Sequence, residues 1–284
     1  MISIITPTYN RAKLLSNIYQ CLLNQTNKDF EWIIINDGSK DNTDKIVKEF
    51  QKKKELNIKY YKKENGGKPS AYNLGVEKST GELLLCLDDD DLLSKDAVEI
   101  ILQDYKEIKN NENVAGLVYN VAYTYNKEKI IGTSLPNNVI DTYFDIYHKY
   151  KVQGDKLQVI KSNIAKQYPM PIISGEKFIP EALINNRISL KYKFKYKSNV
   201  IRYAEYLPDG YTSNYFKLVK SNPLGNALYF KELYNLDKKL YNVYGYVLFS
   251  VYGKKKFKQI LKEHPSKFKI LLVYLPTWII SKIK

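Results

Sequence analysis

The sequence predicts an α/β fold in which a mainly parallel sheet is flanked by helices. Short apolar runs that end in polar or turn-forming residues alternate with amphipathic segments through the first third of the chain. This alternation is typical of parallel strands joined by right-handed helical crossovers. Hydrophobic residues make up 44% of the 284 residues, with only 13 Gly and 10 Pro, so the chain has the composition of a packed globular protein.

The individual elements follow from the apolar patterns in chain order. The predicted strands of the first part are 2–6, 31–36, 58–61 and 82–87, and the predicted helices between them are 12–23, 41–53 and 70–78. A further strand is expected at 116–125, after which the chain is less regular to about residue 154. A helix is expected to end near Arg187. Alternating Lys and aromatic residues over 191–197 then predict a half-buried strand with a solvated Lys face.

The distribution of charge divides the chain. Residues 1–188 carry 26 Lys and Arg against 25 Asp and Glu, whereas residues 189–284 carry 19 against 5. This asymmetry indicates that the C-terminal part contacts something anionic, such as phospholipid headgroups, nucleic acid or a phosphorylated acceptor. We expect a large α/β domain over residues 1–222 and a helical, basic, Lys- and Tyr-rich extension over residues 223–284, with no internal repeat.

The sequence favours a cytoplasmic protein. Cys21 and Cys86 are isolated cysteines, and the first residues lack the basic and cleavable apolar pattern of a secretory signal. The apolar run 270–280 is interrupted by Pro276 and is shorter than the roughly 20 residues that a spanning helix needs. Two alternatives remain for this run. It attaches peripherally to the inner face of the membrane through Lys and Trp278, or it packs against the body of the protein.

An acidic segment, Asp88 to Asp91, follows the apolar run 83–87 directly. Four adjacent carboxylates repel one another unless a cation offsets their charge. Alternate residues share a direction, so Asp88 and Asp90 are expected to bind one ligand together. Oxygen-only ligation favours Mg²⁺ or Mn²⁺, which then bridges a diphosphate. The alternative is a solvated acidic turn that caps the next helix.

Polar segments follow the other predicted strands as well. They are Thr6 to Asn10, Asp37 to Ser39 and Asn65 to Lys68. Because the carboxyl ends of parallel strands converge at one edge of a sheet, a single ligand site is expected there. Asp37 is placed to accept hydrogen bonds from a ribose or a base, or else to form an Asx turn. The Gly-Gly turn allows close approach of a phosphate that Lys68 would neutralise.

In order and spacing, these motifs resemble the family 2 glycosyltransferases of the GT-A, Rossmann-like fold. The resemblance rests on Ile4 to Asn10, Asn36 to Ser39, Asn65 to Lys68 with Ala71 to Gly75, and Gly81 to Asp91. It implies an inverting enzyme that uses a nucleoside-diphosphate sugar, usually UDP-linked, with Mn²⁺ or Mg²⁺ at the acidic segment. Residues 1–222 would then form the catalytic domain.

The resemblance also assigns roles position by position. Asp37 would lie near the base, Asp88 would contact the ribose or the metal, and Asp90 would ligate the metal. Tyr72 stands where many members have Arg, so Lys68 would supply the positive charge near the diphosphate or the base. The residues that would bind the nucleotide sugar are Pro7, Thr8, Tyr9, Asp37, Asn65, Gly67, Lys68, Asn73, Asp88 and Asp89.

An inverting transfer needs a general base that deprotonates the acceptor hydroxyl. By resemblance, Glu181 is the candidate, because Pro180 precedes it and Arg187 follows at the family's spacing. Glu176 is the second choice, and the alternative for Glu181 is an ordinary acid in the first turn of a helix. The segment 206–212 lies where relatives often have His. Asp209 there would be an oxygen ligand, but a plain Pro-Asp-Gly turn is the preferred interpretation.

The predicted function is therefore transfer of one sugar from a nucleotide sugar to a cell-envelope glycan or its lipid-linked precursor, as in capsule, lipopolysaccharide or teichoic acid assembly. A processive synthase is disfavoured, because the chain has no Gln-x-x-Arg-Trp motif. A nucleic-acid or anionic-surface binding protein is the main alternative, although no recognised module supports it and no nucleic acid is expected as a partner. A sugar nucleotidyltransferase is a second alternative, but the chain lacks a Gly-rich, Arg-containing phosphate loop after the first predicted strand.

Overall fold

The computed structural model describes residues 1–205 and 214–283 of the chain. These residues form two compact units, each of which is described by itself. Unit 1 comprises residues 1–169 and 187–205, and unit 2 comprises residues 170–186 together with the chain after Glu205. The expected division into a domain of residues 1–222 and an extension of residues 223–284 stays a prediction.

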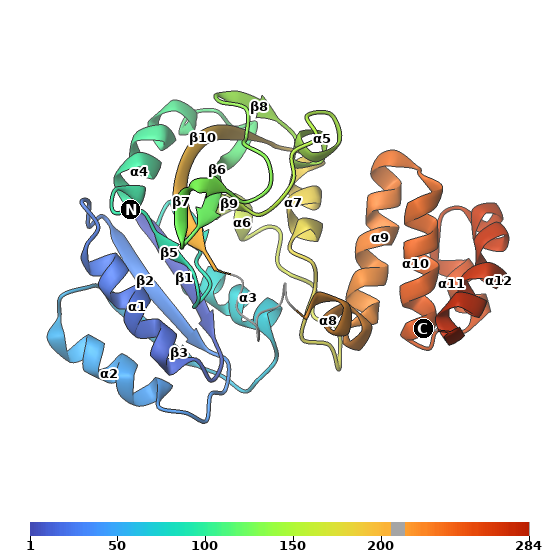
Figure 1. Ribbon diagram of the computed structural model, residues 1–284, viewed down its shortest axis with the longest axis horizontal. Helices are drawn as coiled ribbons and strands as arrows, with labels where there is room; N and C mark the ends of the chain where they lie inside the picture. The colour runs from blue at the N-terminus through green and yellow to red at the C-terminus, as the bar shows by residue number, and fades with distance from the viewer. Residues whose placement is uncertain (206–213, 284) are drawn as a thin grey trace. The chain divides into compact units, whose positions relative to one another are not determined.

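Unit 1 is built on a mixed sheet of ten strands among the described residues (Figure 1). Along the sheet the order is β3-β2-β1-β4-β9-β6-β10-β5, with β7 paired to β6 and β8 paired to β10. The strands are β1 (Ile2–Thr8), β2 (Phe30–Asn36), β3 (Ile58–Lys62), β4 (Leu83–Cys86), β5 (Leu92–Leu93), β6 (Val114–Tyr123), β7 (Asn126–Ile130), β8 (Val139–Asp141), β9 (Lys156–Lys161) and β10 (Lys193–Ala204).

The first four strands in the order, β3, β2, β1 and β4, are parallel to one another. Strand β9 then runs antiparallel to both β4 and β6, while β6 and β10 are parallel. The predicted α/β class with its parallel N-terminal sheet is confirmed. The sequence did not predict β9. This strand lies in the centre of the sheet, between β4 of the parallel half and β6.

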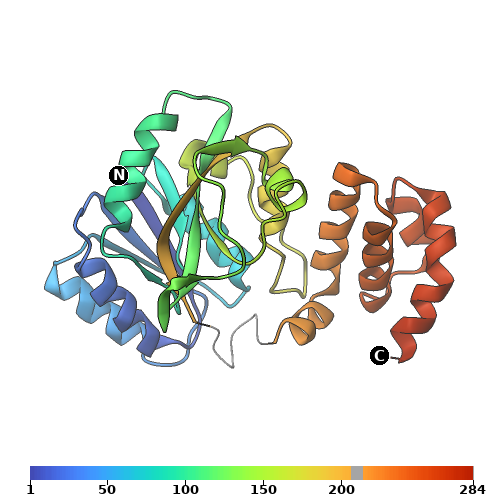
Figure 2. The same ribbon diagram turned by 45° about the horizontal axis from the view of Figure 1, so that its top comes forward.

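Helices cover both faces of the sheet (Figure 2). The buried side chains of α1, α2 and α4 join one core with alternate residues of the central strands, and α3 packs on the opposite face against β1 and β2. The helices that begin in unit 1 are α1 (Ala12–Leu23), α2 (Thr43–Lys53), α3 (Lys68–Lys78), α4 (Ala97–Ile108), α5 (Tyr143–His148) and α6 (Ser162–Ala165), and α7 (Ala182–Ser189) extends from one unit into the other.

The alternation of side chains along β1 explains the two layers. Ile2 and Ile4 point into the core that α1, α2 and α4 share. Ile5 points to the other face, where its Cγ2 lies so close to Gly75 of α3 that a Cβ at that position would come within 2.3 Å of it. Glycine at position 75 therefore allows α3 to approach the strand closely.

The structure refines two expectations about the second half of unit 1. The region expected to be less regular contains three short elements, β7, β8 and α5. The Lys face of β10 is solvated only in part, because Lys193 is exposed whereas Lys195 is half-buried. Lys197 is buried, and its Nζ lies 2.8 Å from Asp104 Oδ1 and 3.0 Å from Glu107 Oε1 on α4, while Lys195 pairs with the same Glu107. Acidic residues of the neighbouring helix take the place of water.

Unit 2 is mainly helical in its described part. It contains α8 (Tyr215–Ser221), α9 (Pro223–Asp237), α10 (Leu240–Tyr252), α11 (Phe257–Glu263) and α12 (Lys267–Ile283). A core of its own joins α9 to α12, with Val243, Tyr246, Val247, Ile260 and Ile270 among its buried side chains. Helix α12 continues through Pro276. Among the residues that the structure describes, none of the helices combines the length and hydropathy needed to cross a bilayer.

Candidate active site

The carboxyl ends of β1, β2 and β4 lie side by side at one edge of the sheet, because these strands are parallel neighbours. Hydrogen bonds connect the segments that follow them. The amide of Asp37, after β2, donates to the carbonyl of Thr8 at 2.9 Å. The hydroxyl of Thr8 donates to Asp89 Oδ2, after β4, at 2.8 Å. Three of the four predicted polar segments are therefore in contact.

The fourth segment, between β3 and α3, wraps around the carboxylate of Asp37. Asp37 Oδ1 accepts hydrogen bonds from Lys63 Nζ at 2.8 Å and from the amide of Gly66 at 2.9 Å. Its Oδ2 accepts from the amide of Gly67 at 2.7 Å and from Asn65 Nδ2 at 3.1 Å. Asp37 is buried, and all four donors belong to one turn. Its carboxylate therefore holds the conformation of that turn.

The same turn brings Lys68 to the acidic segment. Gly67 has a φ of 85°, a left-handed conformation that glycine adopts without steric cost, and it directly precedes α3. Lys68 is the first residue of α3, and its Nζ lies 2.6 Å from Asp88 Oδ1. The cation expected near a diphosphate thus pairs with a carboxylate of the expected metal site.

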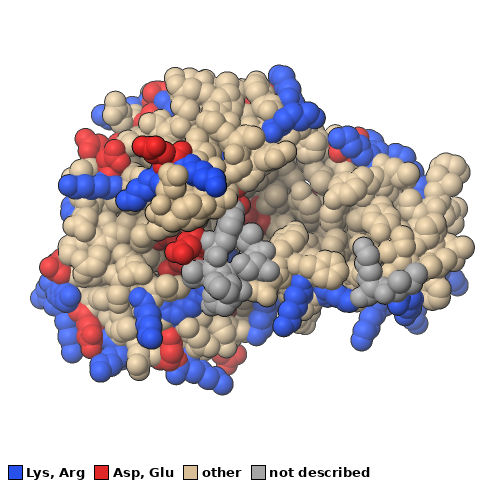
Figure 3. Space-filling view, viewed as in Figure 1, with Lys and Arg blue, Asp and Glu red and all other residues tan. Residues whose placement is uncertain are grey.

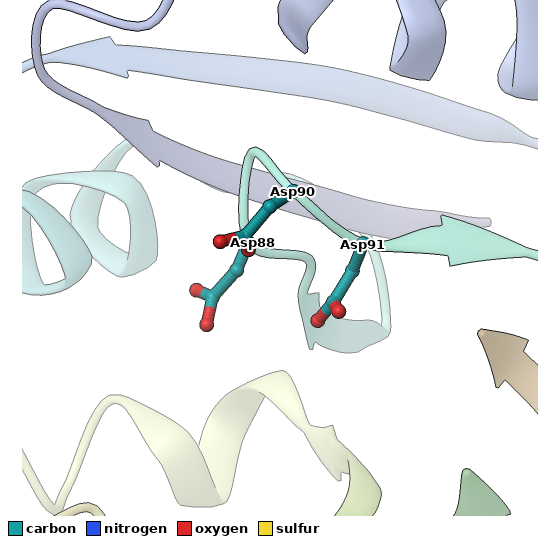
Figure 4. Close-up of side chains that lie close together, drawn as sticks. All are labelled: Asp88, Asp90 and Asp91. Carbon is teal, nitrogen blue, oxygen red and sulfur yellow. The ribbon is translucent and has the colours of Figure 1, made fainter. Parts of the chain in front are cut away.

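Three carboxylates of the acidic segment gather in a small volume. Ligand oxygens of Asp88, Asp90 and Asp91 all lie within 4.8 Å of one another, and the side chains project to the same side of the loop (Figure 4). The amide of Asp91 donates to the carbonyl of Asp88 at 3.1 Å, so the segment is a tight turn. The turn adds Asp91 to the pair that was expected from alternation along an extended chain.

Two arginines offset the charge of these carboxylates. Arg11 Nη1 lies 3.1 Å from Asp89 Oδ1 and 2.8 Å from Asp90 Oδ2. On β10, Arg202 Nη1 lies 3.2 Å from Asp91 Oδ2. Carboxylates this close to one another repel strongly, and adjacent cations reduce that repulsion. The carboxylates of the acidic segment are therefore in contact with the positively charged side chains of Arg11 and Arg202.

Burial and these contacts together set the pKa values of the acidic segment. Burial raises the pKa of Asp89 to about 6, against the opposing charge of Arg11. Burial and the neighbouring carboxylates Asp88 and Asp90 raise the pKa of Asp91 to about 7, against the opposing charge of Arg202. For Asp88, burial acts in the same direction, but the charge of Lys68 outweighs it and holds the pKa below its usual range.

The remaining residues predicted to bind the nucleotide sugar lie on the same elements. Pro7 is part of β1 and pairs with Ile35 of β2 in the ladder. Tyr9 follows β1 and has a side chain that is 45% exposed. Asn73 lies within α3, five residues beyond Lys68. All the predicted nucleotide-binding residues thus belong to unit 1, and all except Asn73 lie at or next to the carboxyl ends of its strands.

Comparison with known proteins assigns the chain to a family. A family model described as Glycosyl transferase family 2 matches residues 3–161, more than half of the 284-residue chain. The chain belongs to glycosyltransferase family 2. The matched region contains every strand of the parallel half of the sheet and the acidic segment. The resemblance noted from the motifs is confirmed.

Two curated relatives show the extent of the similarity. An uncharacterized glycosyltransferase of Rickettsia bellii is 40% identical over 106 residues, which is 37% of this chain and 15% of that protein. The minor teichoic acid biosynthesis protein GgaB of Bacillus subtilis is 36% identical over 117 residues, which is 40% of this chain and 13% of that protein. The matched part of the chain therefore spans less than a fifth of the length of either relative.

A solved structure extends the likeness to the whole fold. TarS of S. aureus, in complex with UDP-GlcNAc, matches with a TM-score of 0.64 over 99% of this chain and 79% of that chain. The sequences are 20% identical, so the likeness concerns the fold. It agrees with the GT-A class expected for a family 2 glycosyltransferase.

The acidic turn of this family 2 domain has the donor chemistry of a site for a hard divalent cation. Asp88, Asp90 and Asp91 offer carboxylate oxygens close enough together to bind one ion. Mg²⁺ and Mn²⁺ prefer oxygen ligands of this kind. The three carboxylates come from one short turn, which the hydrogen bond from the amide of Asp91 to the carbonyl of Asp88 closes. The residues present fit such an ion.

The two candidates for the general base lie in unit 2. Glu181 has an exposed side chain and immediately precedes α7. Glu176 is placed differently, since its Oε1 accepts a hydrogen bond from the amide of Leu224 at 2.6 Å and its Oε2 accepts one from the amide of Gly225 at 2.7 Å. Glu176 thereby satisfies two free amides at the start of α9. Asp209, considered as a further ligand, lies outside the described residues.

Sequence reasoning missed four side chains of the site, namely Arg11, Lys63, Asp91 and Arg202. The arginines carried a usable signal, because the chain has Arg only at positions 11, 187 and 202 among 45 basic residues. In so Lys-rich a chain, an Arg is a candidate for an ion pair that its planar guanidinium suits better than an ammonium. Two of the three contact the acidic turn.

Proposed function

We propose that this family 2 domain transfers a sugar from a nucleoside diphosphate to an acceptor hydroxyl with inversion. The observation that supports the proposal most strongly is the acidic turn, in which Asp88, Asp90 and Asp91 converge at the carboxyl end of β4. In open α/β sheets this edge is where ligands bind. A nucleic-acid binding protein contacts phosphates through Lys and Arg, and that function leaves the carboxylate cluster unexplained.

The nucleoside would be bound at the ends of β1 and β2. Pro7 and Thr8 are the last residues of β1, Tyr9 follows that strand, and Asp37 follows β2. The carboxylate of Asp37 already holds the turn that contains Asn65 and Gly67, so a nucleoside would meet a preorganised surface. Asn73 and Asp89 complete the predicted set, with Asp89 fixed by Thr8.

The divalent ion would be held by Asp88 and Asp90, with Asp91 as a third carboxylate. When bound, such an ion would draw off negative charge from a departing diphosphate. The pKa of Asp88 lies below its usual range because of Lys68, so this carboxyl stays ionised at neutral pH. A carboxylate must be deprotonated to bind the cation, and Asp88 would already be in that form.

The cations of the site would change partners when substrate arrives. Lys68 pairs with Asp88, and Arg11 pairs with both Asp89 and Asp90. A diphosphate brings negative charge that competes for these side chains, and charge-assisted hydrogen bonds to phosphate are strong. Lys68 and Arg11 would then bind the diphosphate, and their side chains would orient it for the reaction.

Glu181 would act as the general base within a catalytic domain of residues 1–222. Its exposed carboxylate would accept the proton of the acceptor hydroxyl while the hydroxyl oxygen attacks the anomeric carbon. The bond between that carbon and the diphosphate breaks in the same step, and the electron pair leaves with the diphosphate oxygen. Glu181 keeps this role because of its position between Pro180 and Arg187 in the sequence, whereas Glu176 bonds to two amides at the start of α9.

The substrates are proposed from chemistry and from the relatives. TarS was crystallised with UDP-GlcNAc, and GgaB is a teichoic acid biosynthesis protein, which favours a UDP-sugar donor and a cell-envelope acceptor for this chain. The acceptor would be a glycan or its lipid-linked precursor. We place the enzyme in the cytoplasm, peripherally at the inner face of the membrane, where nucleotide sugars and such precursors meet.

A donor screen tests the proposal. Purified protein would be incubated with Mn²⁺ and each of UDP-glucose, UDP-galactose, their N-acetyl forms and GDP-mannose, and release of the nucleoside diphosphate would be measured. We expect turnover with one UDP-sugar, loss of turnover in Asp90→Asn, and loss of turnover with retained donor binding in Glu181→Gln. Release of no nucleoside diphosphate from any of these donors in the presence of Mn²⁺ would contradict the proposal.

The same assay separates the two enzyme classes that use this fold and metal. A transferase releases the nucleoside diphosphate, whereas a sugar nucleotidyltransferase forms pyrophosphate from a nucleoside triphosphate and a sugar phosphate. Pyrophosphate formation by this chain would replace the proposed reaction with the second one.

A further inference from the structure

Helix α12 of unit 2 is apolar on two opposite faces. Ile270, Val273 and Thr277 are buried on the face that packs against the other C-terminal helices. On the opposite face, six large apolar side chains are 42% to 71% exposed. They are Phe268, Leu271, Leu272, Leu275, Trp278 and Ile279.

The spacing of the six makes them one continuous surface, which we call the outer face of α12. At 100° per residue, their positions fall within an arc of about 120°. A helix that is apolar on all sides is normally enclosed by protein or lipid. The inner face of α12 has its partner in the core of unit 2, whereas the outer face has none among the described residues.

The surroundings of the outer face are strongly basic. Residues 254–282 contain eight Lys and a single acid, Glu263, with no Arg or Asp. Lys267 and Lys282 lie at the two ends of α12, and the ammonium of Lys282 lies 5.8 Å from the centre of the Trp278 ring. On the face drawn in Figure 3, lysines border the C-terminal helices and acidic side chains are scarce there.

We propose that the outer face of α12 binds the surface of an anionic phospholipid bilayer, with the helix lying in the plane of the interface. Apolar side chains in a band, Trp at its margin and Lys around it are the features of helices that lie in the headgroup region. The proposal goes beyond the sugar transfer and does not depend on it, because it concerns the outer face of α12 and not the acidic segment.

Two further observations favour a bilayer surface over other partners. A second copy of the chain would bring the same lysines together across a two-fold axis, which is unfavourable. Pro276 lies within α12 and has no amide hydrogen, so one backbone carbonyl of the preceding turn loses its helical partner. Such a carbonyl is tolerated at the hydrated interface but not in the hydrocarbon core, which is consistent with a helix that lies on the membrane.

Sedimentation with vesicles tests the proposal directly. The full chain would be mixed with vesicles of phosphatidylglycerol and phosphatidylcholine, or of phosphatidylcholine alone, and the bound fraction measured. We expect binding to the anionic vesicles, weakened by salt. The double variant Leu271→Glu, Leu275→Glu should lower the apparent partition coefficient about tenfold or more, since two apolar contacts are lost. Leu190→Glu, at a leucine of unit 1 that is 71% exposed, is the matched control and should bind as the unmodified chain does.

The tryptophans provide a second readout of the same contact. The chain has two, and Trp32 is fully buried with its indole nitrogen bonded to Thr6 Oγ1, so only Trp278 can meet lipid. Brominated lipids in the anionic vesicles should quench the fluorescence of Trp278. In Trp278→Phe, which retains Trp32, this quenching should disappear.

Three results would overturn the proposal. The unmodified chain could stay in the supernatant with anionic vesicles. The double variant could bind as strongly as the unmodified chain while its melting temperature is unchanged, which would place the contact elsewhere. Light scattering could show a dimer that the double variant converts to a monomer, which would assign the outer face to a second copy.

Discussion

Replacement of Asp37 by Asn tests whether one buried carboxylate holds the turn that carries the site. The substitution preserves shape and removes charge. In the native protein, the two carboxylate oxygens accept four hydrogen bonds, two of them from the amides of Gly66 and Gly67. An asparagine side chain has only one oxygen. Whichever way its amide is turned, its NH₂ group faces a backbone N–H that has lost its acceptor.

The expected loss of stability follows from these contacts. An unsatisfied buried donor costs about 1–3 kcal/mol, and the remaining bonds lose the assistance of a charge. The ion pair with Lys63 adds little, because the Lys63 side chain is 24% exposed and its charge is screened by water. We therefore expect Asp37→Asn to lower the free energy of unfolding by about 2–4 kcal/mol. The loosened turn should also weaken binding of a nucleotide sugar, since Lys68 follows it directly.

Urea unfolding followed by circular dichroism measures the change. The matched control is Asp29→Asn, at a carboxylate that is 55% exposed and pairs with the amino terminus at 3.0 Å. The control should lose no more than about 1 kcal/mol, as is usual for exposed ion pairs. Equal losses in the two variants would refute the role assigned to Asp37.

Three further predictions concern other parts of the molecule. Lys68→Met should raise KM for the donor about tenfold, with a small change in stability because its pair with Asp88 is partly exposed; steady-state kinetics and urea unfolding check both. Gly75→Ala should destabilise the protein by about 1–3 kcal/mol although Ala favours helices, because its Cβ would meet Ile5 at 2.3 Å; a melting temperature equal to that of the native chain would contradict the tight packing. Burial lowers the pKa of His264 to about 4. The neutral ring is then favoured by folding, so this stability is full above the unfolded pKa of about 6.5 and is lost as the pH falls towards 4. Unfolding free energy should decrease by about 2 kcal/mol from pH 7 to pH 5, and His264→Gln should reduce that pH dependence.

The parallel half of the fold could be predicted from sequence because its signals are local. Strands β1, β2 and β4 are short apolar runs, and each ends at a polar residue that begins a loop. Strand β9 was missed for a physical reason. It lies between β4 and β6, and its place depends on pairing with residues far away in the chain, which no local pattern records.

The grouping of the candidate residues at one sheet edge was predictable from the sequence, whereas their contacts were less so. Placement of Asp37, Lys68 and the acidic segment at one edge follows from the direction of parallel strands. The tight turn that adds Asp91 is set by a backbone hydrogen bond, and the pairing of Arg202 with it requires β10 to lie beside β5. These contacts depend on tertiary structure. The alternation of Lys along β10 predicted a solvated face correctly at Lys193 but not at Lys197, because α4 supplies acidic partners there.

The central claim is that the acidic turn binds a divalent cation together with the diphosphate of a nucleotide sugar. The most direct test is calorimetric titration of UDP-sugar into the protein with Mn²⁺ and with EDTA, in the native chain and in Asp90→Asn. The account predicts binding at least about tenfold tighter with Mn²⁺ in the native chain, and no such gain in the variant. Equal affinity in Mn²⁺ and EDTA, unchanged by Asp90→Asn, would contradict it.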